Sequence, residues 1–259
     1  MTIWEAIILG LIQGLTEFLP ISSSGHLVLF QNLFNISESA LSFDIVVHLA
    51  TLISVIAVLF QEIKKLFLNP FSKLTVNIII SAIPAAVIVF VFEAFLKASF
   101  GGNYLGWGFM ISAIFLLIGD LVSQKPQKWL LGNNGLDQIT VGQAFIMGVF
   151  QGIAVFPGIS RSGSTISAGL VAGQDRETAA KFSFLMSIPV VLGAVVVDII
   201  DIGVVNVDIG AGAIIAGFLS ALVSGFFSAK IMLKIVSNHA FWGFSVYLVL
   251  MSLLSFLLL

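Results

Sequence analysis

The stretch GLIQGLTEFLPISSSGH, residues 10–26, has a counterpart in GVFQGIAVFPGISRSGS, residues 148–164. In each, an apolar run breaks at a proline, passes through a cluster of serine and glycine, and continues as a short second apolar piece. Such self-similarity within one chain indicates a duplicated unit. The matching positions include Gln13 and Gln151, Gly14 and Gly152, Phe18 and Phe156, Ser22 and Ser160, Ser24 and Ser162, and Gly25 and Gly163.

The composition around these two stretches is that of an integral membrane protein. Of the 259 residues, 59% are hydrophobic and 9% are charged, and the mean hydropathy is +1.13; soluble domains carry about 25% charged residues. We predict an all-α membrane protein with one domain, residues 1–259, containing two re-entrant broken helices and six transmembrane helices. A helix needs roughly 20 apolar residues to cross a bilayer, and such runs cover about 43–61, 75–96, 104–122, 178–200, 209–230 and 239–258.

The distribution of lysine predicts that the two halves are inverted. Cytoplasmic connections of membrane proteins are rich in Lys and Arg. Counting the predicted crossings then puts the first broken helix on the outer side and the second on the inner side. We expect inverted repeats, about 1–122 and 140–259, whose broken helices meet near the bilayer midplane. The predicted cytoplasmic connections carry Lys64, Lys65, Lys73, Lys125, Lys128, Lys230 and Lys234, and the outer ones carry Lys97, Asp201 and Asp208.

Charge and cysteine content exclude several classes of function. A net charge of −2 gives no basic surface for nucleic acid, so we expect lipids or small solutes as partners. The chain has no cysteine, which excludes disulfides, thiolate metal sites and cysteine nucleophiles. The first ten residues contain no Lys or Arg, so we expect no cleavable signal peptide and a retained N-terminus.

Arg161 is the most informative single residue. An arginine at membrane depth is costly and is by default a functional candidate, and its planar guanidinium suits bidentate phosphate binding. The alternative is a structural ion pair with Glu17. Hydroxyls surround Arg161, and the helix that follows would offer free N–H groups to an anion; packing by small residues is the alternative for each hydroxyl. The predicted phosphate cradle consists of Ser160, Arg161, Ser162 and Thr165.

Glu17 lies one helical turn after Gln13, so the two side chains share a face. In an apolar setting this carboxylate must be paired, protonated or bound to a cation. A carboxylate and an amide oxygen are ligands suited to Mg²⁺ or Ca²⁺, which then need further oxygens from substrate or water. Glu17 as a general base is the second possibility.

The serine cluster after Pro20 supplies a candidate nucleophile, Ser23, beside Ser24 and a candidate acid or base, His26. The alternative for His26 is a hydrogen-bonded core histidine. Asp44 and His48 share a face at the start of the next predicted helix and are weaker candidates.

The combination of QGLTEFLPISSSGH and PGISRSGSTIS resembles the paired signatures of the undecaprenyl-diphosphate phosphatases of the bacitracin-resistance type, over essentially the whole chain. The resemblance implies removal of the terminal phosphate from undecaprenyl diphosphate, which recycles the carrier lipid for cell-wall polymer synthesis. The family's Glu/Gln-x-x-x-Glu motif falls on Gln13 and Glu17, in its glutamine form. The resemblance places the nucleophile at Ser23 with His26 close by, and the arginine motif on Ser160, Arg161, Ser162 and Thr165.

The resulting expectation is that Arg161, the hydroxyls and the helix ends hold the diphosphate, with a divalent cation bridging it to Glu17, while Ser23 attacks the terminal phosphorus. Attack by water or by His26 stays open. We expect a polyprenyl diphosphate substrate, a multi-pass protein of the plasma membrane and a site that opens to the extracytoplasmic side; a homodimer is left open. The competing functions are a polyprenyl-phosphate transporter or flippase, alone or combined with hydrolysis, and a membrane scaffold.

Overall fold

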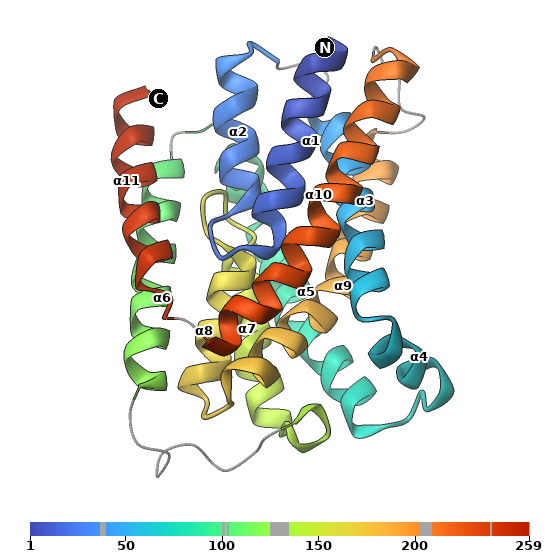
Figure 1. Cartoon of the computed structure of the whole chain (residues 1–259), viewed down its shortest axis with the longest axis vertical. Helices are drawn as coiled ribbons and strands as arrows, with labels where there is room; N and C mark the ends of the chain where they lie inside the picture. The colour runs from blue at the N-terminus through green and yellow to red at the C-terminus, as the bar shows by residue number, and fades with distance from the viewer. Residues whose placement is uncertain are drawn as a thin grey trace.

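The computed structural model describes residues 1–36, 40–99, 102, 104–124, 135–202, 209–238 and 240–258, which form helices joined by turns, with no strand among them (Figure 1). The prediction of an all-α protein is confirmed. The elements are α1 (Ile3–Phe18), α2 (Ser23–Leu33), α3 (Ala40–Val58), α4 (Phe60–Leu68), α5 (Lys73–Ser99), α6 (Leu105–Ser123), the short 3₁₀ helix η2 (Leu136–Gln138), α7 (Val141–Ile153), α8 (Arg161–Val171), α9 (Arg176–Ile202), α10 (Ala211–Asn238) and α11 (Trp242–Leu258).

The first repeated stretch forms the helix pair α1 and α2, and both ends of its turn have a local cause. Helix α1 stops at Phe18, and Leu19 adopts an extended conformation, as a residue before proline must. Helix α2 begins after Ser22, whose hydroxyl accepts a hydrogen bond from the Gly25 N–H and so caps the helix. Ser22 itself has φ of 69°, a left-handed conformation that is costly for a serine.

The second repeated stretch forms the pair α7 and α8 by the same devices. Thr140 and Gln143 make a capping box at the start of α7. The turn passes through Gly158, whose φ of +84° favours glycine. The hydroxyl of Ser160 then accepts a hydrogen bond from the Gly163 N–H at the start of α8. Both predicted broken helices are therefore present as helix, turn and returning helix.

The two turns meet in the middle of the molecule. In Figure 1 the turn between α1 and α2 descends from the end that carries both termini, and the pair α7 and α8 approaches it from the opposite end. Ser162 of α8 donates a hydrogen bond of 3.0 Å to the carbonyl oxygen of Leu19. The predicted meeting of the two broken helices is confirmed; the turn between α1 and α2 is called the first tip and the turn between α7 and α8 the second tip. The repeat boundaries 1–122 and 140–259 stay a prediction.

Each of the six apolar runs contains a helix, and the count of six membrane spans stays a prediction. By length and composition α5, α6, α9 and α10 qualify as membrane spans on their own; α11, with 17 residues, is shorter. Most of α3, Ser42–Val58, qualifies only together with α4, which turns away from it by 82°. Phe67 on α4 and Phe71 just beyond it are 82% and 94% exposed.

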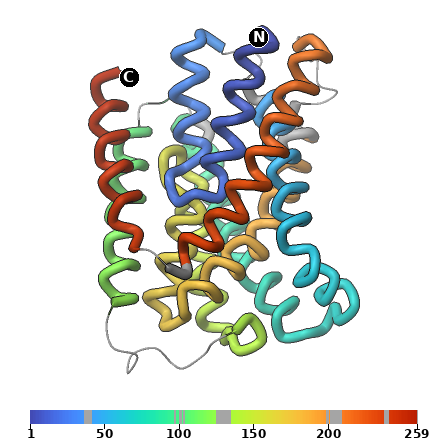
Figure 2. Tube along the Cα trace, in the orientation of Figure 1, coloured from blue at the N-terminus to red at the C-terminus, as the bar shows by residue number. Residues whose placement is uncertain are grey.

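The described lysines of the predicted cytoplasmic connections lie on segments at one end of the molecule. These segments are α4, the start of α5 and the later part of α10, in the lower half of Figure 2, while both termini lie at the upper end. Lys125, Lys128 and Asp208 lie outside the described residues, as do the side chains of Lys97 and Asp201.

Glycine and serine let the helices of the broken pairs pack closely against their neighbours. A Cβ on Gly14 of α1 would lie 2.6 Å from the Ala221 carbonyl oxygen of α10, and one on Gly148 of α7 would collide with the Ser81 carbonyl oxygen of α5. Ser228 of α10 donates a 2.7 Å hydrogen bond to the backbone of α1. Gly10 and Gly14 of α1, and Gly148 and Gly152 of α7, thus form two GxxxG spacings that serve close helix packing.

We therefore predict that Gly148→Ala lowers the midpoint of thermal unfolding in detergent, because the added methyl must displace backbone of α5, at a cost of about 1–3 kcal/mol. Gly142→Ala is the matched control on the same helix, since a Cβ there has nothing within 4 Å. Equal midpoints for the two variants would contradict the close approach of α5 and α7.

Candidate active site

A cavity of about 460 Å³ lies where the two tips meet. Both tips contribute to its wall, together with the first turns of α3 and the middle of α9. Its lining has a polar part, with Glu17, Ser23 and Arg161, and an apolar part, with residues such as Val191 and Val195 of α9. Polar groups converging in an apolar cavity are the usual form of a small-molecule site.

Glu17 is the centre of the polar part of the lining. Its side chain is 5% exposed, and both carboxylate oxygens have partners. Oε1 forms an ion pair with the Arg161 guanidinium from the other tip. Oε2 accepts hydrogen bonds from Ser23 Oγ at 2.5 Å and from Gln13 Nε2 at 3.0 Å. A single carboxylate therefore connects α1, α2 and α8.

Arg161 is the first residue of α8, at the end of the helix that carries free N–H groups. The ion pair with Glu17, which the sequence offered as the alternative to phosphate binding, is present. It leaves Nη1 buried and without a hydrogen-bond partner. Because a guanidinium can donate in two directions, Arg161 can hold Glu17 and still bind an oxygen of a ligand.

The hydrogen bond of Ser23 to a carboxylate is the arrangement expected of an activated nucleophile. Ser23 is the first residue of α2, and its hydroxyl already points its proton at a carboxylate. The N-termini of α2 and α8 both border the cavity, where their dipoles favour negative charge. Ser24 and Ser160, two of the predicted substrate-binding serines, line the same cavity.

Four predicted site residues are not among those that line the cavity: Gln13, whose amide binds Glu17, and the three that follow. His26 Nδ1 lies 2.7 Å from the Ser22 carbonyl oxygen and Nε2 lies 2.6 Å from the Tyr247 hydroxyl of α11, so both ring nitrogens are occupied away from Ser23. Ser162 binds the backbone of the first tip, and Thr165 bonds to Ser183 of α9 at 2.6 Å. This arrangement favours packing roles for all three, and a chemical role for His26 stays a prediction without geometric support.

The cavity also contains residues that sequence reasoning weighed lightly or missed. Asp44 and His48 of α3 line it, and Asp44 accepts a 2.7 Å hydrogen bond from Gln31. The signal for them in the sequence was that Asp44 and His48 share one face of a helix. Gln151 of α7 lines it as well. Its signal was the match with Gln13 in the repeat, which was read only as evidence of duplication.

The described residues do not form a cation site by themselves. Both oxygens of Glu17 already accept hydrogen bonds from protein donors, and no group of three His, Cys, Asp or Glu side chains suited to a metal occurs within the described ranges. Gln13 has a buried Oε1 without a partner, but it is a single neutral ligand. A Mg²⁺ or Ca²⁺ ion held by protein alone therefore does not fit this donor set.

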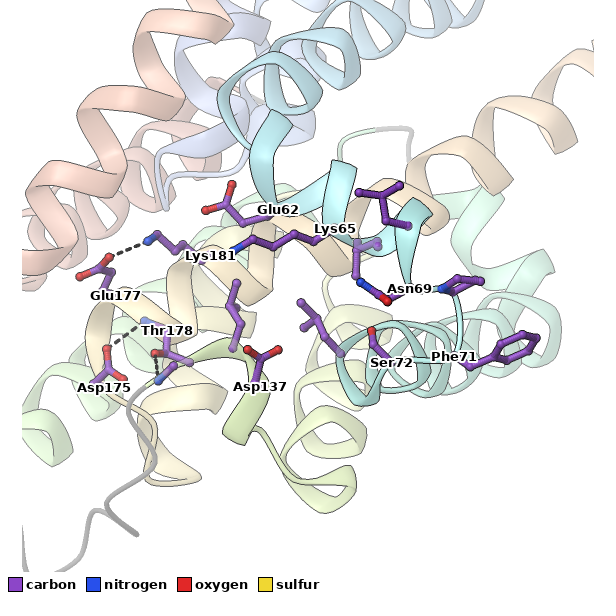
Figure 3. A pocket seen from close by; sticks show the side chains of 16 residues that line it. Glu62, Lys65, Asn69, Phe71, Ser72, Asp137, Asp175, Glu177, Thr178 and Lys181 are labelled. Carbon is purple, nitrogen blue, oxygen red and sulfur yellow. Dashed lines mark hydrogen bonds and ion pairs between the residues drawn. The ribbon is translucent and has the colours of Figure 1, made fainter.

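A second, larger cavity of about 1310 Å³ lies between α4, the start of α5, η2 and the start of α9 (Figure 3). Charges of both signs line it, and Lys181 pairs with Glu177 at 2.6 Å. It contains none of the predicted site residues. The polar group at the tips, rather than the larger volume, identifies the candidate active site.

If His26 and Tyr247 form a structural hydrogen bond, Tyr247→Phe should lower the thermal unfolding midpoint, because it leaves a buried imidazole nitrogen unpaired at a cost of about 1–3 kcal/mol. Tyr104→Phe is the control, since Tyr104 is 47% exposed. An unchanged midpoint in Tyr247→Phe would argue that His26 is free to turn toward the cavity.

Comparison with known proteins shows the family to which this chain belongs. The family model described as "Bacitracin resistance protein BacA" matches residues 6–254. A protein of Carboxydothermus hydrogenoformans named "Undecaprenyl-diphosphatase" is 42% identical, over 95% of this chain and 94% of its own length. A protein of the same name from Methanobrevibacter smithii is 36% identical, over 99% of this chain and 98% of its own. The chain belongs to the BacA family of bacitracin resistance proteins.

Proposed function

We propose that this protein is an undecaprenyl-diphosphate phosphatase, which releases orthophosphate and returns the lipid monophosphate to cell-wall polymer synthesis. The observation that carries the proposal is the contact of Ser23 and Arg161 with the two oxygens of one buried carboxylate, Glu17. The names of the relatives point to the same reaction. An anion site for transport has no need of a serine hydroxyl hydrogen-bonded to a carboxylate.

The first chemical step is attack of Ser23 Oγ on the terminal phosphorus. Glu17 accepts the hydroxyl proton along the hydrogen bond that already joins them. Arg161 and the N–H groups at the starts of α2 and α8 hold the phosphate oxygens and stabilise the charge that develops on them. The lipid monophosphate leaves, and a phosphoserine remains.

Water then completes the turnover by attacking the phosphoserine. The Ser23–phosphorus bond breaks, the proton held on Glu17 returns to the serine oxygen, and orthophosphate is released. Direct attack by water on the diphosphate, or attack by His26, are the other routes. The hydrogen bonds of both His26 ring nitrogens favour the serine route over the histidine route.

The apolar wall of the cavity suits the lipid part of the substrate. Val190, Val191, Ala194 and Val195 of α9 line the cavity and recur at the spacing of one helix face. The isoprenoid tail lies along this wall in the proposal, with the diphosphate at the tips. The bilayer completes the environment of the tail, and we propose no nucleic-acid partner and keep a homodimer open.

The proposed location is the plasma membrane, with the site opening on the extracytoplasmic side. Asp44 and His48 line the cavity from the first turns of α3, whereas the lysines of α4 follow the other end of that helix. If lysine marks the cytoplasm, the cavity lies toward the opposite face.

We further propose that a divalent cation, Mg²⁺ or Ca²⁺, enters together with the diphosphate. The substrate oxygens would supply the ligands that the protein lacks, with Glu17 and the unpartnered Gln13 Oε1 as the protein contribution. The cation would offset negative charge on the diphosphate, while the bonds and protons of the steps above are exchanged among Ser23, Glu17, water and the substrate.

Orthophosphate release from undecaprenyl diphosphate by purified protein tests the site. Ser23→Ala and Arg161→Ala should each lower the rate by about 100-fold or more, because one removes the nucleophile and the other the charge that stabilises the transition state. Ser164→Ala, a buried serine of α8 outside the cavity, and Arg176→Ala, the arginine paired with Asp120, are the matched controls. Near-normal release by Ser23→Ala would exclude the serine route.

Chelation tests the cation separately. Release should stop in EDTA and return on addition of Mg²⁺ or Ca²⁺. If exhaustively chelated protein keeps its full rate while Arg161→Ala stays inactive, the phosphatase assignment stands and the cation proposal fails.

A further inference from the structure

Two residues of the tip cavity carry a buried polar side-chain atom without a hydrogen-bond partner, among the residues that the structure describes. They are Nη1 of Arg161, a donor, and Oε1 of Gln151, an acceptor. A buried polar group without a partner is costly and calls for an explanation. The Arg161 donor is explained by a phosphate oxygen of the substrate. The Gln151 acceptor has no such explanation, because phosphate oxygens accept and seldom donate.

The internal repeat shows why Gln151 lacks a partner. Gln13, its counterpart, is followed one turn later by Glu17 and donates a 3.0 Å hydrogen bond to it. Gln151 is followed at the same spacing by Val155, which also lines the cavity. The second tip therefore places a glutamine in the cavity wall, 1% exposed, without the carboxylate that binds the first one.

The orientation of the Gln151 amide follows from its surroundings. Its Nε2 donates to the Met186 carbonyl oxygen of α9 at 3.4 Å. That carbonyl can only accept, so the amide is held with Oε1 on the other side. Gln151 thus brings an unpartnered acceptor to the wall of the cavity that Arg161 and Ser23 also line.

We propose that Gln151 holds the water that hydrolyses the phosphoserine. The inference rests on the proposed function and goes beyond it by assigning the second half of the reaction to the second tip. A water molecule can donate the hydrogen bond that Oε1 of Gln151 is able to accept. Other phosphoryl-transfer enzymes also use a side-chain amide to orient the attacking water. One hydrogen of the water is bound by Gln151, and a lone pair faces phosphorus.

The step balances without another reactant. The water oxygen bonds to phosphorus as the bond from phosphorus to Ser23 Oγ breaks. The proton that Glu17 took in the first step returns to Ser23, and the protons of the water leave with orthophosphate. Gln151 accepts a hydrogen bond throughout and neither gains nor loses a proton.

A rapid-quench single turnover that counts both products tests the assignment. Undecaprenyl diphosphate is mixed with an equal amount of protein, and the lipid monophosphate, orthophosphate and phosphoserine at Ser23 are measured in the same samples. Gln151→Ala should release the monophosphate as fast as wild type but orthophosphate about tenfold more slowly or worse, so that phosphoserine accumulates. Gln151→Glu, which keeps an acceptor oxygen, should recover part of the second rate.

Gln174→Ala is the matched control. Gln174 is also fully buried, and its amide atoms also lack partners, but it does not line the tip cavity. Both of its rates should equal wild type.

Equal slowing of both products in Gln151→Ala would overturn the proposal, since it would indicate a role in packing or in binding the diphosphate. Unchanged rates for both products would overturn it too. Failure of the proposed function is distinguishable, because wild type would then form no lipid monophosphate at all.

Discussion

The ion pair between Glu17 and Arg161 is the contact on which the site depends, because it joins two helix turns that arrive from opposite ends of the molecule. Each turn carries one charge of the pair, and neither turn supplies the opposite charge itself. Breaking a buried pair by removing one partner commonly costs about 3–5 kcal/mol. The pair therefore favours the association of the tips and fixes the carboxylate beside Ser23.

The same contact connects stability with chemistry. With no ligand present, Glu17 offsets the charge of Arg161, and Ser23 and Gln13 satisfy the other oxygen of Glu17. A diphosphate would bind the unpartnered Nη1 without having to break this arrangement. The N-termini of α2 and α8 add dipoles of the same sign as the guanidinium. Preorganised positive charge around a buried carboxylate is what phosphoryl transfer from an anionic substrate requires.

Much of the fold around the site could be predicted from the sequence, because the sequence signals for it are local or internally repeated. The break at Pro20, the serine caps and the shared face of Gln13 and Glu17 depend on neighbours within a few residues, and the structure confirms them. The facing of the tips followed from counting apolar runs. The 82° bend after Val58 was not predicted, since the run 43–61 is apolar on both sides of it.

The orientation of individual side chains was beyond the sequence. His26 follows the serine cluster closely, but its partner is Tyr247, on a helix at the far end of the chain, and nothing local indicates that contact. Gln151 matched Gln13 in the repeat, yet its unpartnered oxygen depends on Val155 and on the backbone of α9. Such roles are decided by packing between distant segments, which local spacing does not encode.

Exchanging the two charges tests the central claim most directly. Thermal unfolding and orthophosphate release would be measured for Glu17→Arg, for Arg161→Glu and for the double variant. Our account predicts that the double variant regains much of the unfolding midpoint lost by the single variants, but releases no orthophosphate, because Ser23 then faces a guanidinium that cannot accept its proton. Release near the wild-type rate by the double variant would contradict the account.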